Sequence, residues 1–322
     1  MGRHARWVAA VALIAVAVAS VPAGAAPTAA DRSSGGFSRR VDIGGRTVYL
    51  RCRGTGAAGA PTIILMSGYH DSSDVWTDSD LLSLLPPAVG PPVFQALSRS
   101  NRVCAYDRPG TVRYVTGTPL TKRTTPVPQP RTAKDVVEEL HTLLDHARVP
   151  GPYVLVGHSL GGLFVLLYAR TYPDQVEAIV FNDAFSPTVP AVFGPLWPAY
   201  RDGLLNPPPD QAPLESLRSP DSERIDLDAS AAQVEQAPAL PAMPLVVLTK
   251  TESFAGLDPS TMPPGITVDQ VNALYERAED YFVGLAPTTP HVFATGSDHY
   301  IQFSQPDLIV RSTDLVLERI AG

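Results

Sequence analysis

This chain of 322 residues has only two cysteines, no excess of basic residues and a leading apolar run too short to cross a membrane. The run covers residues 7–18, whereas a spanning helix needs about 20 apolar residues. Lysine and arginine number 25 against 32 acidic residues, so the formal charge is −7. Nucleic acids and anionic membranes attract basic surfaces. We therefore expect no nucleic-acid partner and no stable membrane anchor.

The sequence also lacks the residue clusters that hold metals or phosphate groups. Its seven histidines are scattered, and Cys52 and Cys104 lie in no close spacing with any of them. A zinc site places its ligands in closely spaced pairs, and a nucleotide site carries a glycine-rich loop. Neither pattern occurs here, so we expect no metal and no cofactor.

The first residues have the composition of a secretory signal peptide. Arg3 and Arg6 precede the apolar run, and Ala23-Gly24-Ala25 supplies the small residues of a cleavage site. We predict cleavage near Ala25 or Ala26, which makes residues 1–26 the signal peptide and 27–322 the secreted domain. Removal of the two arginines and no acidic residue moves the formal charge from −7 to −9.

Apolar stretches alternate with helical patterns along the rest of the chain. Helices are predicted at 132–147, 163–170 and 308–320, where long apolar runs or apolar residues at helical spacing occur. Such alternation predicts an α/β fold, a mostly parallel sheet with helices on both faces, opened here by an antiparallel hairpin at Gly44-Gly45. The predicted strands are residues 38–43, 47–53, 62–66, 101–106, 152–156, 176–181, 245–248 and 290–294.

A glycine-rich turn joins the strand at 152–156 to the helix at 163–170. It reads Gly157-His158-Ser159-Leu160-Gly161-Gly162, and a Gly-x-Ser-x-Gly turn between a strand and a helix resembles the nucleophile elbow of α/β-hydrolases. The serine stands on a strained turn, so its neighbours must be small where strand and helix approach each other. We predict Ser159 as a nucleophile.

A serine hydroxyl needs a base to accept its proton and a carboxylate to orient that base. In this arrangement the base follows the serine in sequence, and His299 stands in a loop just after the last predicted strand. His291 stands at the start of that strand, where a structural role is expected. Asp183, just after the strand at 176–181, is the predicted acid, with Glu252 as the alternative acid.

Two backbone amides are predicted to form an oxyanion hole. The amide of Leu160 lies at a helix N-terminus, and that of Tyr69 follows Ser67-Gly68 at the end of the third strand. His70 and His158 flank these donors and are assigned to packing or to support of the neighbouring groups, and not to catalysis.

A long proline-rich connection, about residues 184–243, separates the sixth and seventh strands. A compact domain seldom carries so long a connection without a purpose, and we predict a cap over Ser159. Its apolar side chains are either the roof of a pocket or ordinary core; they are Phe185, Val189, Val192, Phe193, Leu196, Trp197 and Tyr200.

Four motifs together resemble the α/β-hydrolase superfamily over nearly the whole mature chain, and within it actinobacterial serine esterases and lipases. The resemblance implies an eight-stranded sheet in the order 1-2-4-3-5-6-7-8. Two departures are Ser67-Gly68, where many relatives have His-Gly, and Ser253 at the position that commonly carries the acid. Relatives that carry their acid after the sixth strand match Asp183. The motifs are residues 52–54, 104–110, 157–162 and 296–302.

In the sheet order of that superfamily, Cys52 and Cys104 fall on neighbouring strands. An oxidising compartment would then favour a disulfide between them, which closes a loop of about 50 residues and contributes about 4 kcal/mol in the chain-entropy model. Neighbouring strands do not guarantee facing side chains, so two buried free thiols stay open as the alternative.

These residues lead to the hypothesis of a secreted serine hydrolase that cleaves small acyl esters through a Ser159–His299–Asp183 triad. A proline-type aminopeptidase or other amide hydrolase is the alternative, with Asp202 or Glu215 to hold a free amine. A non-catalytic binding protein that kept the fold is the second alternative. The natural substrate and the oligomeric state are not determined by the sequence.

Overall fold

The computed structural model describes residues 36–81, 86–254 and 257–322. The predicted signal peptide and its cleavage site lie outside the described residues, so secretion stays a prediction.

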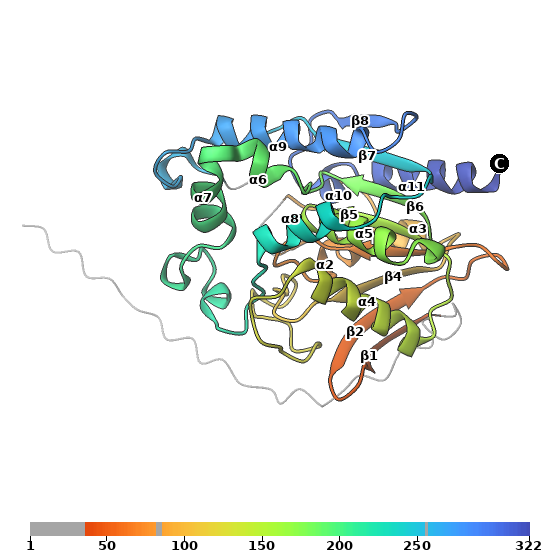
Figure 1. Cartoon of the computed structure of the whole chain (residues 1–322). Coiled ribbons are helices and arrows are strands. Elements are labelled where there is room, and N and C mark those ends of the chain that lie inside the picture. Colours follow the sequence, from red (N-terminus) through yellow and green to blue (C-terminus); the bar gives the residue numbers. More distant parts are fainter. Residues whose placement is uncertain (1–35, 82–85, 255–256) are drawn as a thin grey trace, which may run out of the picture.

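Eight strands of the described chain form one sheet, in the order β1-β2-β4-β3-β5-β6-β7-β8 (Figure 1). From β4 to β8 all neighbouring strands are parallel, and β2 runs antiparallel to both β1 and β4. The predicted sheet order and its opening hairpin are confirmed. The strands are β1 (Phe37–Asp42), β2 (Thr47–Arg53), β3 (Thr62–Met66), β4 (Val103–Asp107), β5 (Tyr153–His158), β6 (Val176–Asn182), β7 (Leu245–Lys250) and β8 (His291–Ala294).

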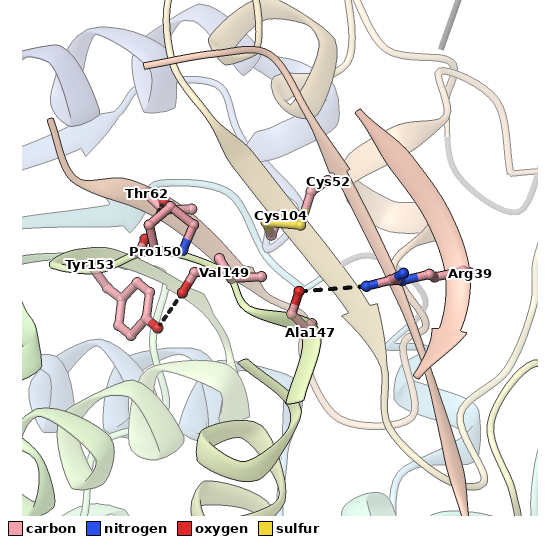
Figure 2. The surroundings of a disulfide bond; sticks show 8 residues. All are labelled: Arg39, Cys52, Thr62, Cys104, Ala147, Val149, Pro150 and Tyr153. Carbon is pink, nitrogen blue, oxygen red and sulfur yellow. Dashed lines mark hydrogen bonds between the residues drawn. A yellow bond between two sulfur atoms is a disulfide. The ribbon is translucent and has the colours of Figure 1, made fainter. Parts of the chain in front are cut away.

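The disulfide joins the antiparallel pair β2 and β4 (Figure 2). Cys52 is the register partner of Cys104, and their Cα atoms are 4.1 Å apart. Directly opposed residues of an antiparallel pair have side chains on the same face of the sheet. The predicted disulfide is therefore confirmed, and the alternative of two free thiols is wrong.

Helices cover both faces of the sheet (Figure 1). The helices are α2 (Asp74–Thr77), α3 (Val93–Leu97), α4 (Ala133–Ala147), α5 (Leu160–Thr171), α6 (Val189–Phe193), α7 (Trp197–Tyr200), α8 (Leu227–Gln236), α9 (Val268–Val283), α10 (Ile301–Ser304) and α11 (Pro306–Ala321).

Alternate residues of the central strands enter two separate hydrophobic cores. Ile64 and Leu155 face the core that α4, α5, α8 and α9 cover. Their neighbours Ile63 and Val154 face the core that α3 and α11 cover. Strand side chains point alternately to the two faces, so a parallel sheet buried on both sides requires the near-continuous apolar runs seen in the sequence.

The structure contains several helices that were not predicted, and the differences at α5 and α9 bear on the candidate site. The helix after the glycine-rich turn begins at Leu160 rather than at residue 163, because Gly161 and Gly162 are part of its first turn. Helix α9 was not predicted. Its N-terminus is a capping box in which Thr267 and Gln270 bind each other's backbone amides, a signal that is readable in the sequence as Thr-x-x-Gln.

The segment between β6 and β7 contains α6, α7, α8 and several short 3-10 turns. Phe185, Val189, Phe193, Trp197 and Tyr200 are buried in the same core as α4 and α5. The cap boundaries at about 184–243 stay a prediction. Within the described residues, no helix combines the length and apolar character that a membrane crossing requires.

Candidate active site

Ser159 lies at the turn between β5 and α5 in a strained backbone conformation, with φ 51° and ψ −126°. The glycines around it have no room for a side chain. A Cβ on Gly157 would lie 2.7 Å from the Gly161 carbonyl oxygen, and one on Gly161 would lie 2.5 Å from that of Met66. The prediction that small residues must surround the serine is confirmed by these close approaches.

His299 lies in the loop between β8 and α10 and is 9% exposed. Its Nδ1 is 2.5 Å from Oδ2 of Asp183. Its carbonyl oxygen accepts a hydrogen bond from Nε2 of His158 at 2.9 Å. Because a carboxylate only accepts, Nδ1 carries the proton in this pair, and in the neutral imidazole the lone pair is then on Nε2. That tautomer suits a general base.

Asp183 follows β6 and is fully buried, also at a positive φ of 42°. Its Oδ1 accepts a hydrogen bond from the Lys250 amide at 2.9 Å, so each carboxylate oxygen has a donor. Glu252, the alternative acid, is exposed, and its carboxylate is bonded to the neighbouring Thr251 hydroxyl. The structure therefore pairs His299 with Asp183, just after the strand next to β5, and not with Glu252.

The two predicted oxyanion donors lie on opposite sides of Ser159 in the chain. Leu160 is the first residue of α5, so its amide has no acceptor within the helix. Tyr69 follows Gly68, whose Cβ, if it had one, would lie 3.0 Å from the Cβ of Ser159. The loop after β3 thus passes directly against the serine. Both amides therefore belong to peptide groups beside Ser159, and their role as oxyanion donors stays a prediction.

The histidines assigned to packing, His70 and His158, both have lowered pKa values. Burial lowers the pKa of His70 to about 4, and its ring stacks on Tyr69 with centroids 3.8 Å apart. Burial and the nearby His299 lower the pKa of His158 well below its ordinary value. His291 bonds through Nε2 to the Thr249 hydroxyl at the opposite end of β8 from His299, which agrees with its structural assignment.

A buried carboxylate behind the site was not found from the sequence. Asp71 is 2% exposed and accepts a hydrogen bond from the Tyr114 hydroxyl at 2.9 Å. Its Oδ2 lies 3.9 Å from Nδ1 of His158. Burial raises the pKa of Asp71 to about 6. Asp71 stands in a loop of mixed polar residues, so the neighbouring sequence does not indicate that this carboxylate is buried.

Helix α9 contributes two more side chains that sequence reasoning missed. The Tyr275 hydroxyl donates to the Asp183 carbonyl oxygen at 3.0 Å and lies beside the Ser159 hydroxyl. Glu279, one turn later, accepts a hydrogen bond from the Ala184 amide at 2.8 Å. Both residues are buried. They face the same turn because residues four apart share one side of a helix.

The residues proposed to hold a free amine are not directed at Ser159. Both carboxylate oxygens of Asp202 bind Arg201, at 2.7 and 2.8 Å. Glu215 is exposed and lines a surface groove with Thr118 and Pro119. No group of three or more potential metal ligands occurs among the described residues.

A model of the alpha/beta hydrolase family matches residues 63–312. The chain belongs to this family. A solved structure titled E-2-(acetamidomethylene)succinate hydrolase superposes with a TM-score of 0.52 at 19% identity, covering 88% of this chain and 99% of that one. The haloalkane dehalogenase DatA from Agrobacterium tumefaciens C58 gives a TM-score of 0.53 at 19% identity, covering 88% and 97%. At these identities the likeness shows the fold.

Curated relatives match parts of the chain. A protein named putative carbamate hydrolase RutD, from Serratia proteamaculans, is 28% identical over 159 residues, covering 49% of this chain and 50% of its own. A protein named probable transporter efuK, from Hormonema carpetanum, is 24% identical over 317 residues, covering 87% of this chain and 42% of its own. The chain spans half or less of the length of these relatives.

Proposed function

We propose that this member of the alpha/beta hydrolase family is a serine hydrolase that cleaves carboxylic esters. The observation that carries the proposal is the contact of His299 Nδ1 with Asp183 Oδ2 at 2.5 Å, because Asp183 directly follows β6 and β6 is the neighbour of β5, which Ser159 directly follows. A carboxylate that holds the Nδ1 proton leaves Nε2 free to accept a proton from a serine hydroxyl. A binding protein has no need of this pair.

The proposed reaction passes through an acyl-enzyme. Ser159 Oγ attacks the ester carbonyl while His299 Nε2 takes its proton, and the amides of Tyr69 and Leu160 bind the oxyanion. His299 then protonates the departing alcohol. A water molecule, deprotonated by His299, attacks the acyl-enzyme, which releases the acid and restores the serine. Asp183 stabilises the imidazolium in both halves.

Esters fit the surroundings of Ser159 better than peptides with a free amine. The side chains near the site are aromatic: Phe185 and Phe254 both pack on Tyr275, and Phe254 packs on His299. Asp202 is paired with Arg201 and does not offer its charge to an amine. Ser159 also stands where a dehalogenase needs a carboxylate nucleophile. We therefore propose apolar or aromatic acyl esters as the substrates.

We also propose that the protein is secreted after removal of residues 1–26. The disulfide between Cys52 and Cys104 supports this proposal, because disulfides persist in oxidising compartments. N-terminal sequencing of protein recovered from the culture medium should begin next to Ala26. An intact N-terminus in the cell pellet would contradict export.

A fluorophosphonate probe tests the proposed nucleophile. The wild-type protein should be labelled covalently and Ser159→Ala should not. Panels of p-nitrophenyl esters, aminoacyl anilides and aryl carbamates then rank the substrate classes, with the highest kcat/KM expected for esters. If the folded wild type were neither labelled nor active, the proposal would be wrong and the non-catalytic binding protein would be the remaining hypothesis. Faster turnover of the anilides would make the protein a peptidase.

A further inference from the structure

The loop after β4, Asp107-Arg108-Pro109-Gly110, is a motif that the proposed mechanism leaves without a role. Its arginine is 1% exposed, and such a buried charge requires a full set of partners. The Arg108 guanidinium has partners on two other segments. They are the carbonyl oxygens of Ser67 and Gly68, at 2.9 and 2.5 Å, and the two carboxylate oxygens of Glu223, at 2.6 and 3.0 Å.

The bond to the Gly68 carbonyl fixes the direction of the Tyr69 amide. The carbonyl of Gly68 and the N–H of Tyr69 belong to one peptide group, which is trans, so they point in opposite directions. Arg108 holds the carbonyl side. The N–H of Tyr69 is therefore directed away from Arg108, and Gly68 itself packs against Ser159. The arginine thus sets the orientation of a proposed oxyanion donor that it does not touch.

Glu223 brings the segment between β6 and β7 into the same arrangement. It precedes α8 and is fully buried. Besides Arg108, its Oε2 accepts a hydrogen bond from the His70 amide at 2.8 Å. Its own amide donates to the Gly110 carbonyl at 3.0 Å. A Cβ on Gly110 would lie 2.5 Å from the Glu223 nitrogen, so this close approach requires glycine.

We propose that Arg108 and Glu223 are positioning residues for catalysis, which hold the loop of residues 67–70 so that the Tyr69 amide points at the oxyanion. The segment between β6 and β7 then contributes to rate as well as to substrate fit. Without the pair, the Gly68 carbonyl keeps only its bond from the Asp71 amide, at 3.2 Å, and the Tyr69 amide is held less firmly toward the oxyanion in the transition state. This proposal rests on the proposed ester hydrolysis.

The test removes both charges at once, in the double variant Arg108→Met/Glu223→Leu. Replacing a buried ion pair by apolar side chains of similar volume is often neutral or stabilising, so this variant separates positioning from folding. We expect a folded protein whose thermal midpoint is lowered only by the lost bonds to the Ser67 carbonyl and the His70 amide, with a KM that is little changed. The kcat for a p-nitrophenyl ester should fall about 10²-fold, the typical cost of one oxyanion donor.

A second buried pair serves as the matched control. Arg131 and Glu139 form an ion pair at 3.2 Å, with side chains 6% and 0% exposed, and neither contacts the loop of residues 67–70. Arg131→Met/Glu139→Leu should keep the wild-type kcat. An Arg108/Glu223 double variant that is folded and retains the wild-type kcat would overturn the positioning role. A wild type without turnover or labelling would instead overturn the proposed function.

A measurement on the wild type keeps the proposal testable if the double variant does not fold. In protein labelled with ¹⁵N-tyrosine, a boronic acid that adds to Ser159 should shift the Tyr69 amide resonance downfield, as a new hydrogen bond requires. A Tyr69 amide that does not respond, in a protein that forms the adduct, would show that no donor is positioned there and would overturn the proposal.

Discussion

The two turns that carry Ser159 and Asp183 have similar geometry and different construction. Each follows a central parallel strand, and each residue has a positive φ, 51° for Ser159 and 42° for Asp183. They are joined directly: the Ser159 amide donates to the Asn182 carbonyl, and the Phe185 amide donates to the Ser159 carbonyl. Non-glycine residues rarely adopt this conformation, and where they do the surroundings must hold them.

The serine turn is held by its own neighbours in sequence. Gly157, Gly161 and Gly162 allow the strand, the helix and the Asp183 turn to approach within distances that no side chain permits. The aspartate turn contains no glycine. Distant residues hold it instead, namely the Lys250 amide, the Tyr275 hydroxyl and the Glu279 carboxylate. The same backbone strain can thus be stabilised by local composition or by tertiary contacts.

The largest effect is expected from the carboxylate that the aspartate turn presents. Asp183→Asn should lower kcat about 10⁴-fold, because the amide favours the wrong imidazole tautomer and cannot stabilise the imidazolium. Glu252→Gln, at the exposed alternative position, should leave kcat unchanged. Steady-state ester hydrolysis measures the kcat of both variants. Equal losses in the two variants would mean that the pairing of His299 with Asp183 does not carry the reaction.

The contact between the two turns can be broken and restored. A Cβ on Gly162 would lie 2.3 Å from the Cβ of Ala184, so Gly162→Ala should lower the free energy of unfolding by about 1–3 kcal/mol. Adding Ala184→Gly should recover most of this loss, because it removes the atom in collision. Urea unfolding of both single variants and the double variant measures the coupling. Strictly additive effects would locate the strain elsewhere.

The support of the aspartate turn by α9 is tested with Tyr275→Phe. The variant keeps the ring, which packs against Phe185 and Phe254, and removes only the hydroxyl. Loss of one buried neutral hydrogen bond corresponds to about a tenfold fall in kcat if the bond fixes the reacting groups. The control is Tyr281→Phe, on the same helix as Tyr275, which removes a hydroxyl bonded to Arg170 of α5. Equal kcat values for the wild type and Tyr275→Phe would mean that the hydroxyl contributes to stability and not to the reaction rate.

The smallest effect concerns the pH dependence of stability through Glu279. Burial and the charge of Asp183 raise the pKa of Glu279 well above its ordinary value of about 4.5. A raised carboxyl pKa contributes stability below pH 4.5, and this contribution is lost as the pH rises toward the raised value. Glu279→Gln stays neutral and lacks this loss. Its thermal midpoint should therefore rise relative to that of the wild type as the pH increases above about 4.5.

A parallel pH dependence of the two midpoints would contradict the raised pKa. Because the side-chain amide introduced by Glu279→Gln can still accept the bond from the Ala184 amide, kcat at neutral pH should change little. Circular dichroism melting curves over the pH range, with ester turnover at one pH, give both readouts.

Much of the fold could be predicted because its signals are local. The strands are short apolar runs between turn residues, and the glycine-rich turn fixes where β5 ends and α5 begins. Cys52 and Cys104 were expected on neighbouring strands, but their facing positions depend on the register of β2 and β4. Helix α9 was missed although Thr267-x-x-Gln270 marks its start, because its amphipathic face carries tyrosine and glutamate among the apolar residues.

The residues of the candidate site also fall into two groups, those that local motifs predicted and those that only the structure revealed. Ser159 and His299 stand in motifs with recognisable spacing, and Asp183 could be ranked before Glu252 only by its position at the end of a strand. Tyr275, Glu279 and Glu223 stand in ordinary helical or loop sequence. Their partners are 92, 95 and 115 residues away. No local pattern encodes contacts of that sequence separation.

The sequence by itself determined the strands, the glycine-rich turn at Ser159 and the candidate base, because each depends on residues within a few positions of one another. The tertiary structure alone decided which carboxylate meets His299 and which side chains hold the strained turn at Asp183. It also decided that Arg108 and Glu223 meet at the loop of residues 67–70. The physical reason is burial. A buried charge or a strained residue is stable only when partners surround it, and those partners come from distant parts of the chain that folding brings together.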